Sequence, residues 1–149
     1  MSIWFTPYTP EVNIAMRSNN MLEHLDIHIT EVGDNYIKGT MPVDHRTKQP
    51  AGLLHGGASV VLAESLGSIA ANLVVDPALF SCVGLEINAN HVRAVRSGFV
   101  TGVAKPIHIG ATTQLWSIEI FDERGSLVCI SRITMAVLKR KSKKLEKYL

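Results

Sequence analysis

Residues 58–75 read ASVVLAESLGSIAANLVV, an apolar run without proline. A run of about eighteen residues is too long for a typical strand, so it predicts a helix. Apolar side chains occur around most of the circumference of this helix, so we expect it to be buried on nearly all sides. The polar residues that interrupt the run exclude an ordinary membrane-spanning helix. They are Ser59, Glu64, Ser65, Ser68 and Asn72.

Shorter extended segments flank this helix along the chain. Alternating or apolar patterns between turn signals predict strands at residues 26–32, 36–43, 81–93, 98–106, 112–122 and 127–139. Residues 122–125 (DERG) join the last two strands as a hairpin, and residues 9–25 predict short helical pieces. One antiparallel sheet curled around the long helix would bury it with few elements. We therefore expect an α+β fold.

The composition indicates one folded domain over residues 1–149, with a basic tail from about residue 139. Hydrophobic residues make up 46% of the chain and charged residues 19%, which excludes intrinsic disorder. A net charge of +2 indicates no nucleic-acid partner, and we expect no signal peptide, since residues 1–10 carry no lysine or arginine. The two cysteines, Cys82 and Cys129, are too few for a disulfide framework and are expected in the core. We expect a cytoplasmic protein without a membrane partner. The basic tail is expected to be solvated, or to attract a phosphorylated ligand through its first residues.

Glu64 is the only carboxylate between Asp44 and Asp76, and it lies in the middle of the predicted buried helix. An ionised carboxylate among apolar side chains is costly unless something compensates it, and burial should raise its pKa. Ser68 follows one turn later on the same face of the helix. A glutamate paired with a distant arginine, or facing solvent, is the alternative. The apolar helix favours a functional carboxylate.

The sequence His55-Gly56-Gly57 stands at the start of the helix. Glycines there allow a ligand to approach closely, and the first helical turn offers unpaired N–H donors at the positive end of the helix dipole. Such a place stabilises negative charge on an oxygen, as acyl transfer requires. A tight loop-to-helix turn is the alternative. The histidines lack metal-ligand spacing and no GxSxG, GxGxxG or P-loop motif occurs, so we expect no metal and no cofactor.

These motifs resemble the hotdog-fold acyl-CoA thioesterases of the 4-hydroxybenzoyl-CoA and phenylacetate-pathway type. The resemblance covers residues 21–138 and includes the segments 84–91 (GLEINANH) and 114–120 (QLWSIEI). Within this group the pattern is most similar to the bacterial 1,4-dihydroxy-2-naphthoyl-CoA hydrolases of menaquinone synthesis. The resemblance implies a hotdog fold, a homodimer or homotetramer with the active site at the dimer interface, and hydrolysis of aromatic acyl-CoA thioesters.

The resemblance also assigns roles to single residues. Gly56 and Gly57 would hold the oxyanion, with the N–H of Gly56 favoured, and Glu64 would act as nucleophile or as general base. The other members of the motif would position the thioester or the attacking water: Gln49, His55 and Ser68.

Coenzyme A would need cations and N–H groups around its phosphates. The positions that the resemblance matches to this role are Asn90, His91, Arg93, Ile109, Gly110, Ala111 and Thr112. Arg93 and Arg96 suit phosphate oxygens, or are ordinary surface charges. The CoA thioester is the substrate, so no cofactor is implied.

Two other functions stay open. A hotdog enoyl-CoA hydratase or dehydratase would use a histidine and a carboxylate together, whereas Gln49 and the glycine pair favour hydrolysis. A non-catalytic acyl-CoA-binding module would have an inert residue in place of Glu64.

Overall fold

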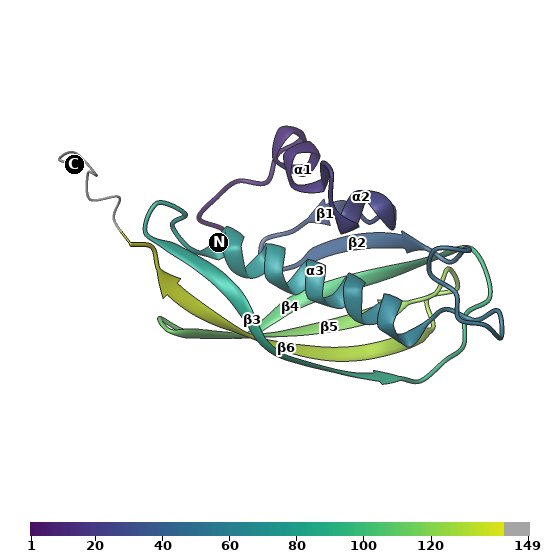
Figure 1. The fold of residues 1–149 in the computed structure, drawn as a ribbon. Helices are drawn as coiled ribbons and strands as arrows, with labels where there is room; N and C mark the ends of the chain where they lie inside the picture. The colour runs from purple at the N-terminus through teal and green to yellow at the C-terminus, as the bar shows by residue number, and fades with distance from the viewer. Residues whose placement is uncertain (142–149) are drawn as a thin grey trace, which may run out of the picture.

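The computed structural model describes residues 1–141 and shows one antiparallel sheet wrapped around one long helix (Figure 1). The helices are α1 (Pro10–Arg17), α2 (Met21–His24) and α3 (Gly56–Val74). The strands are β1 (His28–Val32), β2 (Ile37–Pro42), β3 (Phe80–His91), β4 (Phe99–Ile109), β5 (Thr113–Phe121) and β6 (Leu127–Lys139). Their order in the sheet is β1-β2-β4-β5-β6-β3. The predicted α+β architecture is confirmed. Most of the predicted basic tail lies outside the described residues.

Helix α3 begins two residues before the predicted start, because His55 caps it and both glycines fall in its first turn. No residue from Ala58 to Val74 is exposed, and eight residues of the helix are buried. By length and hydropathy alone α3 could cross a membrane. Its packing against all strands from β2 to β6 instead makes it the core helix of this fold.

Two glycines of the sheet make room for α3. Gly39 on β2 and Gly102 on β4 are direct cross-strand partners. A Cβ added at Gly39 would lie 2.8 Å from a methyl group of Leu66, and one added at Gly102 would lie 2.6 Å from the other. Leu66 therefore packs into a trough in the sheet that only glycines leave open, which fixes the depth at which α3 sits.

The N-terminal segment closes the core near the end of α3. The Phe5 and Thr6 N–H groups both donate to the Leu73 carbonyl oxygen. Trp4 stacks on the fully buried Trp116 of β5, with ring centroids 6.1 Å apart, and donates its indole N–H to the Gly33 carbonyl at 2.6 Å. The first residues of the chain are thus tied to the middle of the sheet.

Substituting Gly67 with alanine should destabilise the protein by about 1–3 kcal/mol, because a Cβ there would lie 2.6 Å from the Ile133 side chain. Helix propensity alone would favour alanine by about 1 kcal/mol, so the two effects have opposite signs. Denaturant unfolding of G67A measures which one dominates.

Ser65→Ala is the matched control, because Ser65 lies in the same helix and, among residues 1–141, its hydroxyl bonds only the Val61 carbonyl. This change should stay within about 1 kcal/mol of the parent. A G67A protein as stable as the parent would show that α3 does not pack tightly on β6.

Candidate active site

Three positions of α3 contact the edge strand β3: Gly56, Glu64 and Asn72. Val60 and Ser68 lie between them at the same four-residue spacing, and together the five form one inclined row on the helix. The side-chain amide of Asn72 accepts from the Cys82 N–H at 2.9 Å and donates to the Cys82 carbonyl at 3.1 Å. This double contact anchors β3 along the row that carries the predicted catalytic residues.

Glu64 is half-buried in this row and lies against Gly84 of β3. A Cβ added at Gly84 would be 2.6 Å from Glu64 Oε1, so glycine there makes room for the carboxylate. β3 has a bulge between Gly84 and Glu86, at the place where the carboxylate rests. Burial raises the pKa of Glu64 above its ordinary value. No ion pair of Glu64 occurs within residues 1–141, so the alternative of a distant arginine partner is not supported.

The start of α3 presents one unpartnered N–H. His55 is the N-cap, and its Nδ1 accepts from the Gly57 N–H at 2.8 Å. The Ala58 and Ser59 N–H groups donate to the His55 carbonyl at 2.9 and 3.2 Å. In the described part of the chain the Gly56 N–H has no acceptor. It is therefore the donor at the positive end of α3 that is left for a ligand oxygen.

The His55 cap also defines the tautomer of the ring. Because Nδ1 accepts a hydrogen bond, a neutral His55 carries its proton on Nε2. His55 is exposed, so this second N–H can donate to a bound ligand beside Gly56. His91, at the end of β3, lies over Gly56: a Cβ added at Gly56 would be 2.7 Å from His91 Nε2.

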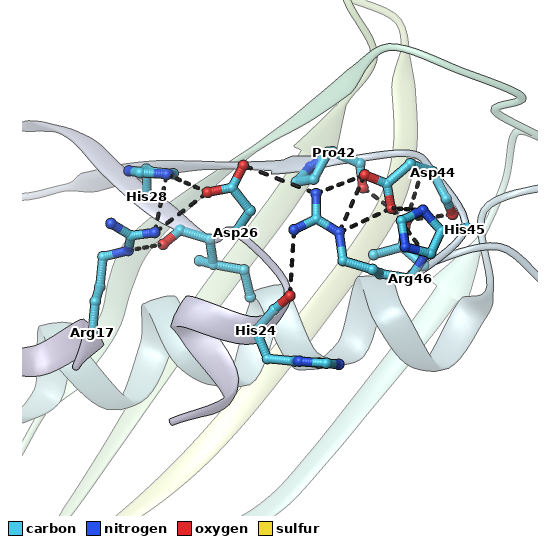
Figure 2. Close-up of polar contacts among 10 residues, drawn as sticks. Arg17, His24, Asp26, His28, Pro42, Asp44, His45 and Arg46 are labelled. Atoms are coloured by element: carbon cyan, nitrogen blue, oxygen red, sulfur yellow. Dashed lines mark hydrogen bonds and ion pairs between the residues drawn. The ribbon is translucent and has the colours of Figure 1, made fainter. Parts of the chain in front are cut away.

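Gln49 lies in the turn between β2 and α3, which Figure 2 shows in part. Its N–H donates to the Leu53 carbonyl at 2.8 Å, its carbonyl accepts from the Gly52 N–H at 2.9 Å, and its side-chain oxygen accepts from the Ala51 N–H. Gly52 has φ +80°, a conformation that favours glycine. Gln49 is thus held on a tight turn a few residues before the His55 cap.

Glu64 and the Gly56 N–H do not meet within one chain. They are eight residues apart on one helix, which corresponds to about 12 Å along its axis. One thioester carbonyl cannot contact both across that distance.

The residues predicted to bind coenzyme A fall into two groups. Asn90, His91 and Arg93 lie at the end of β3, beside the start of α3, where Leu54 N–H donates to the Val95 carbonyl at 2.8 Å. The second group forms the end of β4 and the turn to β5: Ile109, Gly110, Ala111 and Thr112. This turn meets the last residues of β6, since the Val137 N–H donates to the Thr112 carbonyl at 2.8 Å. The two groups therefore lie at opposite ends of the sheet in a single chain.

A surface hollow of about 440 Å³ lies next to the first group and includes three arginines: Arg93, Arg96 and Arg124. None of the three side chains has an acidic partner among residues 1–141. The Asp122 carboxylate instead accepts from the Arg124 and Ser126 N–H groups of the hairpin, at 3.0 and 2.8 Å. Glu123 also lines the hollow, so three arginines face two carboxylates and leave an excess of one positive charge. The arginines are the groups that could bind a phosphate.

Sequence reasoning missed several residues that shape this site. Gly84 belongs to a quoted segment, and a glycine inside a strand is a signal of close approach by another group. Asn72 shares the four-residue spacing of Glu64 and Ser68, which could have placed it on the same face. Arg124 had no local signal beyond its hairpin. Within residues 1–141 no group of three or more potential metal ligands is found.

Comparison with known proteins identifies the family. Residues 51–129 match the thioesterase superfamily. The chain is 57% identical to the 1,4-dihydroxy-2-naphthoyl-CoA hydrolase of Escherichia coli, over 91% of this chain and 99% of that protein. It is 49% identical to the proofreading thioesterase EntH of Cronobacter sakazakii, over 91% of this chain and 98% of that protein.

A solved structure agrees with both sequence matches. The crystal structure of thioesterase HI1161 from Haemophilus influenzae superposes with a TM-score of 0.90 at 45% identity, covering 96% of this chain and 99% of that one. These similarities favour thioester hydrolysis over the hydratase and the binding module. The chain belongs to the thioesterase superfamily, and it is a thioesterase with the hotdog fold.

Proposed function

We propose that this thioesterase hydrolyses aromatic acyl-CoA thioesters, with Glu64 as the catalytic carboxylate and the Gly56 N–H as the oxyanion donor. The observation that carries this proposal is that one row of α3 holds two polar groups that lack a partner within residues 1–141. The Gly56 N–H has no acceptor and the half-buried Glu64 has no cation within residues 1–141. The naphthoyl-CoA hydrolase named among the relatives supports an aromatic acyl group.

The chemistry follows from these two groups. The Gly56 N–H polarises the thioester carbonyl and stabilises the oxyanion that forms when the carbonyl carbon is attacked. Glu64 either removes a proton from the attacking water or attacks the carbon itself to form an anhydride that water then cleaves. In both routes the C–S bond breaks and coenzyme A leaves as a thiolate. His55 Nε2–H, Gln49 and Ser68 would position the carbonyl and the water.

We further propose that two copies of the chain share each site. The 12 Å rise between Gly56 and Glu64 supports this proposal, because a second copy could supply the group that one chain cannot bring to the same carbonyl. β3 is an edge strand whose Val83 and Leu85 side chains are 44% and 62% exposed, and such an edge needs a partner. Pairing β3 with β3 of a second copy about a two-fold axis would bring the end of one sheet beside the opposite end of the other.

This arrangement would also reunite the predicted coenzyme A residues. The turn at residues 109–112 of one copy would approach Arg93 and the start of α3 of the other. The three arginines of the hollow would then face the phosphates, with Arg124 added to the predicted set. A homotetramer of two such dimers and a cytoplasmic location complete the proposal. The buried, free Cys82 and Cys129 support a reducing compartment.

Glu64→Gln should lower turnover of an aromatic acyl-CoA by about 10²–10⁴-fold, because the amide can neither attack nor accept a proton. Burial raises the pKa of Glu64, so the folded protein holds the proton of this carboxyl more tightly than the unfolded chain does. The stability that this difference contributes is lost as the pH rises through the folded-state pKa, where the buried carboxyl ionises. E64Q should therefore unfold at higher temperature than the parent at alkaline pH, with no difference at low pH. Thiol release and thermal unfolding across pH measure both effects.

Glu119→Gln is the control, because Glu119 lies on β5 between the buried Ile118 and Ile120 and thus points away from α3. It should change neither quantity. Full turnover by E64Q would overturn the proposed function.

Gly56→Pro should lower kcat by about 10²–10³-fold by deleting the oxyanion donor. Gly56 is the first residue of α3, where proline is well tolerated, and His55 has φ −69° and ψ 131°, the extended conformation that precedes proline. The lost N–H has no partner in the described chain, so helix α3 should remain intact. Steady-state kinetics and circular dichroism measure the two expectations.

Gly56→Ala separates the N–H from the steric effect. It adds a Cβ against His91 while keeping the N–H, so it should retain far more turnover than G56P. Equal losses in both variants would show that the N–H holds no oxyanion.

Mixing E64Q subunits with G56P subunits should restore activity if the sites are shared. A mixed dimer combines Glu64 of one copy with Gly56 of the other in one of its two sites. Random pairing would therefore recover about a quarter of the parent activity. The mixture is assayed after co-expression, with each variant alone as the control. No recovery in a verified mixed dimer would place both groups of a site in one chain.

A further inference from the structure

A chain of acidic, basic and imidazole side chains connects the N-terminal helices to the turn that carries Gln49. Figure 2 shows its members side by side, from Arg17 and His28 through Asp26 to Arg46 and Asp44. Arg17 lies at the end of α1, and Asp26 follows α2. Arg46 and Asp44 belong to the connection between β2 and α3. The family match begins only at residue 51, so this chain of charges lies outside it.

The Arg46 guanidinium binds the Asp44 carboxylate within the turn itself. Arg46 Nε lies 3.1 Å from Oδ1, and a terminal nitrogen lies 2.6 Å from Oδ2, so the pair is bidentate. This arginine lowers the pKa of Asp44 to about 2. The Arg46 backbone N–H also donates to Asp44 Oδ1 at 2.9 Å, and this bond does not depend on the arginine side chain.

Arg46 also reaches across to the N-terminal segment. Its Nη1 donates to the carbonyl of His24, which is the last residue of α2, at 3.4 Å. Its Nη2 lies 4.0 Å from Asp26 Oδ2. Asp26 Oδ1 in turn lies 2.6 Å from His28 Nε2 and 3.4 Å from Arg17. Arg46 is therefore the member of this chain that contacts both the turn and α2.

The backbone at Asp26 indicates that its side chain matters. Asp26 has φ +56°, a left-handed conformation that usually falls to glycine at the end of a helix. An aspartate there costs conformational energy that a glycine would avoid. A glycine at this position would have no carboxylate. The Asp26 carboxylate lies between Arg17 and Arg46, so its contacts with them are what the aspartate adds.

The turn held by Arg46 leads directly to the catalytic groups. The buried Thr47 donates its hydroxyl to the Pro42 carbonyl at 2.7 Å, and its own carbonyl accepts from the His55 N–H at 2.8 Å. Gln49 follows Thr47 by two residues. The Pro42 and His55 contacts hold the Thr47 backbone in place, so the Arg46 side chain is expected to act mainly on the exposed part of the turn that carries Gln49.

We propose that Arg46 is a positioning residue that holds the Gln49 turn against the end of α2 and so sets the place of the Gln49 side chain in the reaction. This inference rests on the proposed function, in which Gln49 positions the thioester or the water. Arg46 itself touches no reacting atom. Its contribution should pass through Gln49 and disappear when Gln49 is absent.

A double-mutant cycle of Arg46→Ala and Gln49→Ala tests this proposal, with thiol release from an aromatic acyl-CoA as the assay. In the parent background R46A should lower kcat by about tenfold or more with little change in KM. In the Q49A background the same change should alter kcat by less than about twofold. The backbone bond from residue 46 to Asp44 persists in R46A, so the variant should fold. Arg46→Lys, which keeps the charge but not the bidentate pairing, should fall between R46A and the parent.

Lys48→Ala is the matched control, because the exposed Lys48 lies in the same turn and forms no ion pair within residues 1–141. It should leave kcat unchanged in both backgrounds. Parent-like turnover in R46A, or equal fold losses with and without Gln49, would overturn the proposal. Should R46A fail to fold, the R46K cycle is read by the same criterion. If the parent protein itself released no thiol from an aromatic acyl-CoA, the proposed function would be rejected instead.

Discussion

A half-buried carboxylate beside an edge strand, with no neutralising cation among residues 1–141, is the constraint on which the proposed site depends. Glu64 lies on a helix with eight buried residues, and burial raises its pKa. The surrounding structure accommodates this costly group in specific ways. Gly84 and the adjoining bulge of β3 make room for the carboxylate, and Asn72 secures β3 two turns further along α3. In the proposed function the fold thus maintains a catalytic acid at the cost of some stability, as active sites commonly do.

Some glycines of this protein allow close packing, and one has a proposed chemical role. Gly39 and Gly102 let Leu66 sink into the sheet, and so determine how close α3 approaches β2 and β4. Gly56 leaves an N–H unpartnered at the positive end of the same helix. The depth of α3 and the exposure of its first turn are therefore linked, because one helix carries both the packing contacts and the N–H that we propose as the oxyanion donor.

The sequence predicted the architecture well, because a long apolar helix and alternating strands leave few ways to bury the core. Strand β6 was predicted with the observed bounds, and most other boundaries were off by one to three residues, where caps and turns decide. Glu64 could be singled out because it is a carboxylate within an apolar helix. His55 and Gly56 could be singled out because they stand at the start of that helix, where N–H groups lack partners. Arg46, Asp26 and Arg124 could not, since their inferred roles depend on distant segments: Arg46 lies 4.0 Å from Asp26, and Arg124 lines the same hollow as Arg93 and Arg96. The residues at 109–112 lie far from the other predicted coenzyme A residues in one chain, a separation that no linear pattern reveals.

The stacking of Trp4 on Trp116 has a consequence for how the protein is made. Trp4 leaves the ribosome long before Trp116 has been translated, so the N-terminal segment has no aromatic surface to dock on for most of synthesis. Its contact with Trp116 can form only after β5 has been synthesised, so this contact cannot guide the folding of the earlier part of the chain. A nascent chain stalled before β5 would therefore hold this tryptophan in water.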